Sequence, residues 1–311
     1  MAERVRVQAV SRANLGPLVE MAEHLRAALP GWQDTAPADG RSRPPSDLAL
    51  DFAHLAHHDG DGFLVATVDD TVAGLCTAFV RSRTLSLTGI WILPEFQDRP
   101  VAASLIRRAL AYGDRAGAVE ACSLVLGDAG LEGELFRFGL RPRFPVYRLR
   151  LAAAAAKTLG SELARLLPGG EVSEDSVRHR TGRSDTERID RLTRGLARPM
   201  DHDHWLVGRG LRVAMVRAGD RVAAYAYGGA GQCGPLAATT SDAALAALGW
   251  ALQMAAADAE GAVEAQVPGV FEGAVEHLLE AGGRCLAAGA WMTRHPVSGM
   301  ERCLLASTTI P

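Results

Sequence analysis

Alternation of polar and apolar residues predicts a mixed α/β domain in the first half of the chain. Residues 4–10 (RVRVQAV) alternate charged or polar with apolar side chains, as a half-buried strand does. Asn14 then stands at the N-cap position of residues 15–29, whose apolar side chains recur at helical spacing. The pattern continues in the order βααβββαβαβ. We expect further helices over 48–58, 101–115 and 131–138, and strands over 62–68, 72–81, 85–93, 121–126 and 146–151.

A long polar segment interrupts this pattern after the first helix. Residues 30–47 (PGWQDTAPADGRSRPPSD) are rich in Pro, Gly, Ser and Asp, which is typical of a loop. A loop of this length inside a compact domain is often a lid or a binding loop. We therefore expect a substrate to bind against it.

The second half repeats the pattern more weakly. Residues 69–80 (DDTVAGLCTAFV) resemble 219–230 (GDRVAAYAYGGA), because each has an acid and then Val-Ala before a strand. FRFGLRPRF around Gly139 likewise resembles LLEAGGRCL around Gly282. Two matches in the same order predict a duplicated domain. In this half we expect helices over 185–196, 242–257 and 272–281, strands over 213–216, 222–228 and 262–267, and a final strand pair.

These patterns together predict an α/β (α+β) fold of two tandem domains, each a mixed, mostly antiparallel sheet flanked by helices. The predicted boundaries are 1–151 for the first domain and 185–311 for the second. Residues 152–184 are predicted to be a linker that contains a helix, followed by an arginine-rich polar stretch.

Composition narrows the class of protein. The formal charge of −3, from 33 basic and 36 acidic residues, provides no electrostatic footprint for duplex nucleic acid. The five cysteines are scattered, which fits a reducing compartment and predicts neither a disulfide framework nor a metal site. No signal peptide and no 18-residue apolar run occur, so we expect a cytoplasmic protein without a membrane partner.

Residues 201–205 (DHDHW) suggest a metal site at first sight. Histidines two residues apart lie on different faces of a helix, however, and no further ligand cluster is evident. We interpret the segment as a capped helix start and predict no metal.

Residues 92–106 (ILPEFQDRPVAASLI) are predicted to form a strand followed by a loop that opens a helix. In this segment the first half resembles the GNAT superfamily of N-acetyltransferases. The residues that match the family pattern are Pro94, Glu95, Phe96, Gln97 and Ala102. FGLRP at 138–142 resembles the Gly-Phe-Arg-Pro of the family. The resemblance implies an N-acyltransferase that moves an acetyl or other small acyl group from acyl-CoA to a small-molecule amine.

The helix start in this segment has the physical properties of an anion site. Unpaired backbone N–H groups and the positive end of the helix dipole suit a pyrophosphate. Pro100 replaces a glycine of the family loop and removes one N–H donor. Arg99 could compensate by pairing with a phosphate. By resemblance, the residues expected to bind acyl-CoA are Ile92, Leu93, Gln97, Asp98, Arg99, Pro100, Val101, Ala102, Asp128 and Phe136.

The catalytic groups are less well defined. The tyrosine that often protonates the leaving thiolate in the family corresponds to Leu135, beside Phe136, and neither can donate a proton. The candidate bases are Glu95, Asp34 and His57, with His54 and His58 as further possibilities on the acceptor side. Trp32 and Trp91 are candidates for the wall of the substrate pocket.

Residues 231–248 (GQCGPLAATTSDAALAAL) are predicted to be a Gly-Pro-Leu-Ala-Ala turn before a helix. With EHLLEAGGR near Gly282, they make the second half resemble a divergent GNAT domain that lacks the phosphate loop. Asp242 at a helix start would repel a phosphate. We expect this half to shape the acceptor pocket or an interface, with a homodimer as one arrangement. Two alternatives stay open. The chain could be a catalytically degenerate tandem GNAT that binds a ligand or partner, or it could use a non-CoA donor such as aminoacyl-tRNA or a carrier protein, contacted by the arginines of residues 178–194.

Overall fold

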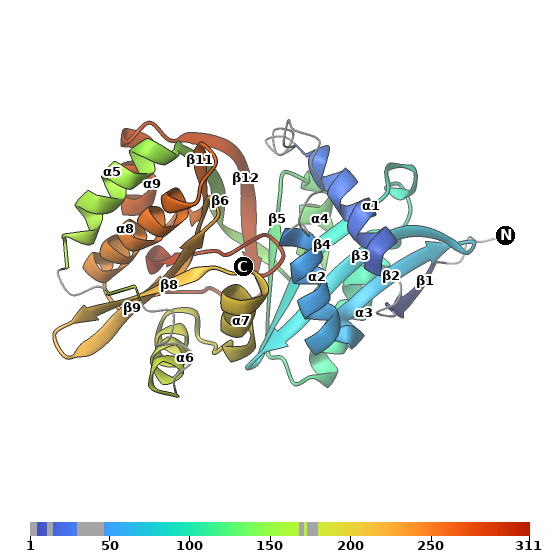
Figure 1. Ribbon diagram of the computed structural model, residues 1–311. Helices are drawn as coiled ribbons and strands as arrows, with labels where there is room; N and C mark the ends of the chain where they lie inside the picture. Colours follow the sequence, from blue (N-terminus) through green and yellow to red (C-terminus); the bar gives the residue numbers. More distant parts are fainter. Residues whose placement is uncertain (1–4, 11–14, 30–46, 168–170, 173–179) are drawn as a thin grey trace. The chain divides into compact units, whose positions relative to one another are not determined.

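The computed structural model describes residues 5–10, 15–29, 47–167, 171–172 and 180–311 (Figure 1). The chain forms two compact units, which are described one at a time. Unit 1 comprises Met1–Arg143 and Gly289–Pro296, and unit 2 comprises Phe144–Ala288 and Val297–Pro311. No described helix has the length and apolar character that a membrane span requires.

Unit 1 is built on a sheet in the order β1-β2-β3-β4-β5, with the end of β12 beside β5. All pairs are antiparallel except β4–β5. Its elements are β1 (Val5–Ala9), α1 (Leu15–Ala27), α2 (Asp47–His58), η2 (Gly60–Gly62), β2 (Phe63–Val68), β3 (Thr71–Arg81), β4 (Thr84–Ile92), η3 (Pro94–Phe96), α3 (Val101–Arg115), β5 (Glu120–Val125) and α4 (Ala129–Arg137).

Helices cover both faces of this sheet, because the strands are apolar on both sides. Phe63 and Val65 of β2 pack in the core beneath α1 and α2. Leu64 and Ala66, the alternate residues, pack in the core beneath α3. Alternation along a strand thus divides one apolar run between two helical layers, and Figure 1 shows α1 and α2 on the face opposite α3.

Unit 2 contains a second sheet in the order β6-β11-β10-β9-β8-β7, with β13 beside β10. The β10–β11 pair is parallel and β6–β11, β10–β9, β9–β8 and β8–β7 are antiparallel. Its elements are β6 (Arg141–Ala152), α5 (Ala153–Ala164), β7 (Glu171–Val172), α6 (Arg180–Arg194), α7 (Pro199–Asp203), the π-helical turn η4 (His204–Gly208), β8 (Arg212–Ala218), β9 (Arg221–Gly229), β10 (Gln232–Ala238), α8 (Ser241–Ala257), β11 (Ala262–Pro268), α9 (Glu272–Glu280), β12 (Arg284–Thr293), η5 (Met300–Arg302) and β13 (Cys303–Leu304). The first residues of β6 and the last of β12 belong to unit 1.

The order of elements in unit 2 repeats that in unit 1. The run β8-β9-β10-α8-β11-α9 corresponds to β2-β3-β4-α3-β5-α4. The two similar sequence segments fall on equivalent places, because 69–80 forms most of β3 and 219–230 forms β9. Gly139 after α4 and Gly282 after α9 both adopt a positive φ, at 91° and 89°. This is the helix-ending conformation that favours glycine.

Each half of the chain contributes a strand to the other unit's sheet. Residues Ala290–Thr293 of β12 pair with β5, and residues Val146–Ala152 of β6 pair with β11. The limits of the two units therefore differ from the predicted domain boundaries at 151 and 185. Local periodicity indicates that a strand exists, but it carries no information about the strand that will pair with it.

Two elements of unit 2 differ from their sequence-based assignment. The predicted linker contains α5, whose residues Ala156, Leu159 and Leu163 lie in the main apolar core of unit 2. β10 was expected to be a turn, because Gly234-Pro235 interrupts it. The strand tolerates the proline at a shift of register between Cys233 and Leu236.

Close contact between α5 and α8 depends on two facing glycines. A methyl group on Gly249 would stand 2.7 Å from the carbonyl oxygen of Gly160 and closer still to the backbone nitrogen of Ala164. We therefore predict that Gly249→Ala lowers stability by about 1–3 kcal/mol through overpacking. Gly133→Ala on α4 is the control: it meets nothing within 4 Å and should raise stability by about 0.5–1 kcal/mol. Equal melting temperatures for the two variants would contradict the close packing.

Candidate functional site

The strands β4 and β5 of unit 1 separate before they end. Their parallel pairing runs from Thr84↔Glu120 to Leu87↔Ser123. β4 continues to Ile92, paired on its other side with β3. In the part of the chain that the structure describes, no strand pairs with the β5-facing edge of β4 beyond Leu87. The sheet therefore contains an opening there, hereafter the β4/β5 opening.

The backbone of β4 presents a donor to this opening. Leu93 donates its N–H to the carbonyl oxygen of Ala73 on β3, at 3.0 Å. Successive residues of a strand alternate between its two edges, so the N–H of Ile92 faces the side away from β3. Of the two predicted ligand-binding residues here, Ile92 has a backbone donor at the opening, while the N–H of Leu93 already serves the sheet.

The start of α3 supplies further donors beyond the end of β4. Pro100 is the N-cap residue, and no side chain caps this helix. The first helical hydrogen bond is from Ser104 N–H to the carbonyl oxygen of Pro100, at 3.1 Å, and the N–H of Val101 donates to Arg99 at 2.8 Å. The geometry of a helix start leaves the N–H groups of Ala102 and Ala103 without an intrahelical acceptor. With the positive end of the helix dipole, they suit an anion.

The loop before α3 is held in place by one aromatic residue. Phe96 is buried in the core beneath α3, and the guanidinium carbon of Arg99 lies 5.2 Å from the centre of its ring. Arg99 therefore brings a positive charge to the helix start. Gln97 and Asp98 are exposed, and the carboxylate of Asp98 partly offsets this positive charge.

Other predicted ligand residues have roles within α4. The side chain of Asp128 caps the helix by accepting from the N–H of Leu131, at 2.9 Å. Phe136 is half exposed, with the guanidinium carbon of Arg141 3.7 Å from its ring centre. Leu135 is fully buried in the core, which explains why an apolar side chain stands at that position.

The described catalytic and pocket candidates lie on three different elements. Glu95 is exposed on η3, and His57 is exposed in the last turn of α2, with its ring 4.6 Å from that of His58. Trp91 packs in the core beneath α1 and α2, where its indole N–H has no partner among the described residues. Asp34 and Trp32 lie outside the described residues.

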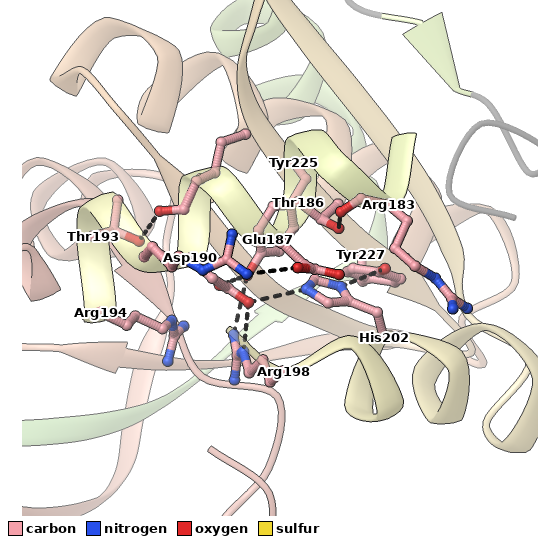
Figure 2. A network of polar contacts seen from close by, with 12 residues as sticks. Arg183, Thr186, Glu187, Asp190, Thr193, Arg194, Arg198, His202, Tyr225 and Tyr227 are labelled. Atoms are coloured by element: carbon pink, nitrogen blue, oxygen red, sulfur yellow. Dashed lines mark hydrogen bonds and ion pairs between the residues drawn. The ribbon is translucent and has the colours of Figure 1, made fainter. Parts of the chain in front are cut away.

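Unit 2 contains a buried polar network that the sequence did not reveal (Figure 2). Its central residue is Asp190 of α6, and the other members are Arg198, His202, Tyr225 and Tyr227. None of the five residues is more than 2% exposed. The network is therefore enclosed by protein on all sides.

Each of the other four members of the network has a hydrogen-bond partner within it. One carboxylate oxygen accepts from Arg198 Nε at 3.2 Å and lies 3.0 Å from His202 Nε2, and the other accepts from the hydroxyl of Tyr225 at 2.5 Å. The second imidazole nitrogen of His202 shares a hydrogen bond of 2.8 Å with the hydroxyl of Tyr227. The guanidinium of Arg198 also donates to Tyr225 at 3.1 Å.

The opposite charges of Asp190 and Arg198 stabilise each other inside the network. Burial acts to raise the pKa of Asp190, but the charge of Arg198 and the hydrogen bond from His202 outweigh it and lower that pKa to about 2. Burial raises the pKa of Tyr225 and of Tyr227 above their usual value. The carboxylate is therefore charged and both phenols are neutral at physiological pH. The result is a complete ion pair inside the unit.

This arrangement corrects the interpretation of residues 201–205. The helix α7 begins at Pro199, its N-cap is Arg198, and no side chain caps it. The expectation of a capped start at this segment was wrong, because the helix begins before it, at Pro199. His202 instead turns inward to Asp190 and Tyr227. No cluster of metal ligands occurs among the described residues. The sequence feature that could have indicated the network is the pair Tyr225 and Tyr227, because alternation along a strand places both side chains on one face of β9.

Comparison with known protein families supports the predicted family resemblance of the first half of the chain. Residues 20–129 match the model of the acetyltransferase (GNAT) family, a range that includes β2 to β5 and the loop before α3. This confirms the resemblance predicted for that half. No curated protein matches the sequence.

Solved structures share the fold along nearly the whole chain. A putative acetyltransferase from Pyrococcus horikoshii has a TM-score of 0.69 at 15% identity, over 99% of this chain and 96% of that one. A GCN5-related N-acetyltransferase from Sphaerobacter thermophilus has a TM-score of 0.58 at 13% identity, over 94% and 96%. A tandem GNAT protein from the clavulanic acid biosynthesis pathway has a TM-score of 0.56 at 14% identity, over 95% and 100%. At these identities the similarity establishes the fold alone, and the predicted fold class is confirmed.

The buried network predicts a specific response to acid. Because the pKa of Asp190 is lower in the folded protein than its ordinary 3.8, its charge stabilises the fold fully above about pH 4, and this contribution is lost as the pH falls through about 2. Asp190→Asn should therefore weaken the dependence of the melting temperature on pH in this window. At neutral pH it should cost about 3–5 kcal/mol, because Arg198 is left buried without its partner.

A surface pair provides the matched control for this variant. Asp185 pairs with Arg188 at 3.0 Å, but both side chains are about a third exposed. Asp185→Asn should therefore cost no more than about 1 kcal/mol. If Asp190→Asn melted like Asp185→Asn and kept the wild-type acid profile, Asp190 would not be a charged member of the network.

Proposed function

We propose that this chain, whose residues 20–129 match the acetyltransferase (GNAT) family, is an N-acyltransferase that transfers an acetyl or other small acyl group from acyl-CoA to an amine. The observation that carries the proposal is the β4/β5 opening, which lies between an unpaired edge of β4 and the uncapped start of α3. An extended ligand with amides in its middle and phosphates at one end has complementary chemistry.

The residues present fit acyl-CoA in two respects. The N–H groups of Ala102 and Ala103 would hold its pyrophosphate, with Arg99 as the nearest loop cation. The edge of β4 between Leu87 and Ile92 would pair with the amides of its pantetheine arm, as one strand pairs with another. When bound, acyl-CoA supplies an activated thioester carbonyl.

The contribution of the protein to the reaction would be mainly orientation. The N–H of Ile92 would donate to an oxygen in the opening, and the rigid sheet would keep that donor in place as charge develops there. The side chain of Leu135 has no acidic proton, so no side chain at that position acts as an acid. We therefore propose that the chain relies on holding a neutral amine against the carbonyl. Glu95 and His57 stay candidate bases, and Asp34 lies outside the described residues.

Two rival functions remain distinguishable from this one. The loss of an N–H at Pro100 and the apolar Leu135 favour a catalytically degenerate protein that binds its ligand without turnover. A phosphate-bearing donor such as aminoacyl-tRNA would need exposed cations that are not already paired. Arg183 is exposed but pairs with Asp203 at 2.6 Å, and Arg188 donates to the carbonyl oxygen of Val222 at 2.5 Å. These internal contacts make α6 a weaker candidate for phosphate binding.

The remaining expectations stay predictions. They are a cytoplasmic location, a small-molecule amine as acceptor, a homodimer, and the absence of membrane and duplex nucleic-acid partners.

The substitution Pro100→Gly tests the proposed donor site. Glycine restores one N–H at the N-cap of α3, and a hydrogen bond to a charged group is worth roughly 1.5–3 kcal/mol. Lost preorganisation opposes this gain by roughly 0.4–1 kcal/mol. We expect acetyl-CoA to bind the wild type in calorimetry and to bind Pro100→Gly several-fold to about tenfold more tightly.

Pro94→Gly at the start of η3 controls for added flexibility and should not tighten binding. Undetectable binding of millimolar acetyl-CoA to both wild type and Pro100→Gly would overturn the proposal. Binding without release of free thiol across a panel of amines would instead support the degenerate alternative.

A further inference from the structure

The strands of unit 2 that correspond to β4 and β5 also separate, but their gap is filled. β10 and β11 are parallel and pair only at Gln232↔Glu264 and Cys233↔Ala265. Beyond this point β10 turns to another partner. β13 pairs with it antiparallel, at Leu236↔Leu304 and Ala237↔Cys303. The two strands therefore diverge around a segment of their own chain.

The inserted segment also contacts β11. Leu305, the residue after β13, forms a bridge with Gln266 and donates its N–H to the carbonyl oxygen of Gln266 at 3.1 Å. Residues 303–305 thus bond to β10 on one side and to β11 on the other. Cys303, Leu304 and Leu305 are completely buried, so the segment fills the gap with side chains as well as with backbone.

Side chains from other elements fasten the carbonyl groups of this segment. Arg194 donates to the carbonyl oxygen of Leu304 at 2.6 Å, and the amide of Gln232 donates to that of Ala306 at 2.9 Å. Beyond the segment, Arg198 of the buried network donates to the backbone oxygen of Pro311 at 2.6 Å. Displacement of the segment would break the bonds from Arg194 and Gln232 and leave these donors only their contacts to Leu236 at 3.4 Å and Gly234 at 3.0 Å. Loss of hydrogen bonds from such poorly solvated donors is costly.

The helix start next to this gap is also unsuited to a phosphate. The side chain of Thr240 caps α8 by accepting from the N–H of Ala243, so one donor is already used. The second residue of α8 is Asp242, which is exposed, whereas the second residue of α3 is Ala102. A carboxylate at that place repels an anionic ligand that the helix dipole would otherwise attract.

We propose that residues 303–306 are a built-in occupant of the β10/β11 gap, so that the chain has one acyl-CoA site, in unit 1. This inference rests on the proposed function. The backbone of the segment supplies to β10 and β11 the partners that an extended ligand would supply to β4 in the β4/β5 opening. Unit 2 keeps the fold of the repeat while its equivalent of the ligand groove is permanently closed.

Exchange of one residue between the two helix starts tests the number and place of the sites. Acetyl-CoA is titrated calorimetrically into the full chain, into Ala102→Asp, which copies the acid of unit 2 into unit 1, and into Asp242→Ala, which does the reverse. An acid in the first turn suits a helix, so Ala102→Asp should keep its fold. Equal melting temperatures check this.

We expect one acetyl-CoA per chain in the wild type and in Asp242→Ala, and binding at least about tenfold weaker in Ala102→Asp. Two acetyl-CoA per chain in the wild type or in Asp242→Ala would overturn the closure of unit 2 while leaving the proposed function intact. Unchanged binding to Ala102→Asp would also overturn the inference, because it would place the site away from α3. No binding to any form would overturn the proposed function and the single site with it.

Thiol labelling tests the closure without relying on ligand binding. Cys303 is buried within β13, while Cys285 is exposed on β12, so the two provide an internal comparison. Treatment of the native chain with a maleimide should label Cys285 rapidly and leave Cys303 unmodified in peptide mapping, with or without acetyl-CoA. Labelling of Cys303 at the rate of Cys285 would show that the segment leaves the gap, and would overturn the inference.

Discussion

A strand that parts from its neighbour must find new partners for its backbone N–H and C=O groups, and this requirement shapes both units. In unit 1, β4 leaves β5 after Leu87 and no described strand replaces it. In unit 2, β10 leaves β11 after Cys233 and residues 303–305 replace it. One repeated architecture therefore has two outcomes. The opening that stays unpaired is the one followed by an uncapped helix start, and both features suit a ligand with amides and phosphates.

The buried network of unit 2 holds the chain beyond the inserted segment. Asp190 compensates the charge of Arg198 inside the unit, and Arg198 in turn donates to the backbone oxygen of Pro311, five residues after the inserted segment 303–306. A buried ion pair with every hydrogen bond satisfied favours one arrangement strongly, because any alternative leaves a charge unpaired. The network thus fixes the position of Pro311, and nothing in its enclosed position requires a catalytic role.

Sequence patterns were sufficient for the elements whose signals are local. The helix at 101–115 and the strands around the turn at Asp69-Asp70 lie where periodicity and turn residues placed them, and both aspartates adopt the positive φ of a tight hairpin. The loop before α3 was identified by family resemblance. β10 was missed because Gly234-Pro235 looks like a turn, and α5 was assigned to a linker because its alanine-rich sequence has little amphipathic contrast.

The long-range features could not be predicted from the sequence. β6 pairs with β11, and β12 pairs with β5. These pairings depend on which strand edges meet, and no single segment encodes that choice. The network joins residues from α6, α7 and β9 that lie up to 37 positions apart (227 − 190), so no motif contains it. The sequence alone could not assign local structural roles to Asp128 and Leu135. Only the structure explains them, as a helix cap and a core residue.

The most direct measurement of the central claim is amide hydrogen exchange of the full chain with and without acetyl-CoA, resolved to single residues by NMR. The opening and the helix start predict that acetyl-CoA slows exchange at Ile92, Ala102 and Ala103, the backbone donors that would contact it, and leaves Leu305 unchanged. Protection confined to β10, β11 or α8, with no effect on β4 and α3, would contradict an acyl-CoA site in unit 1.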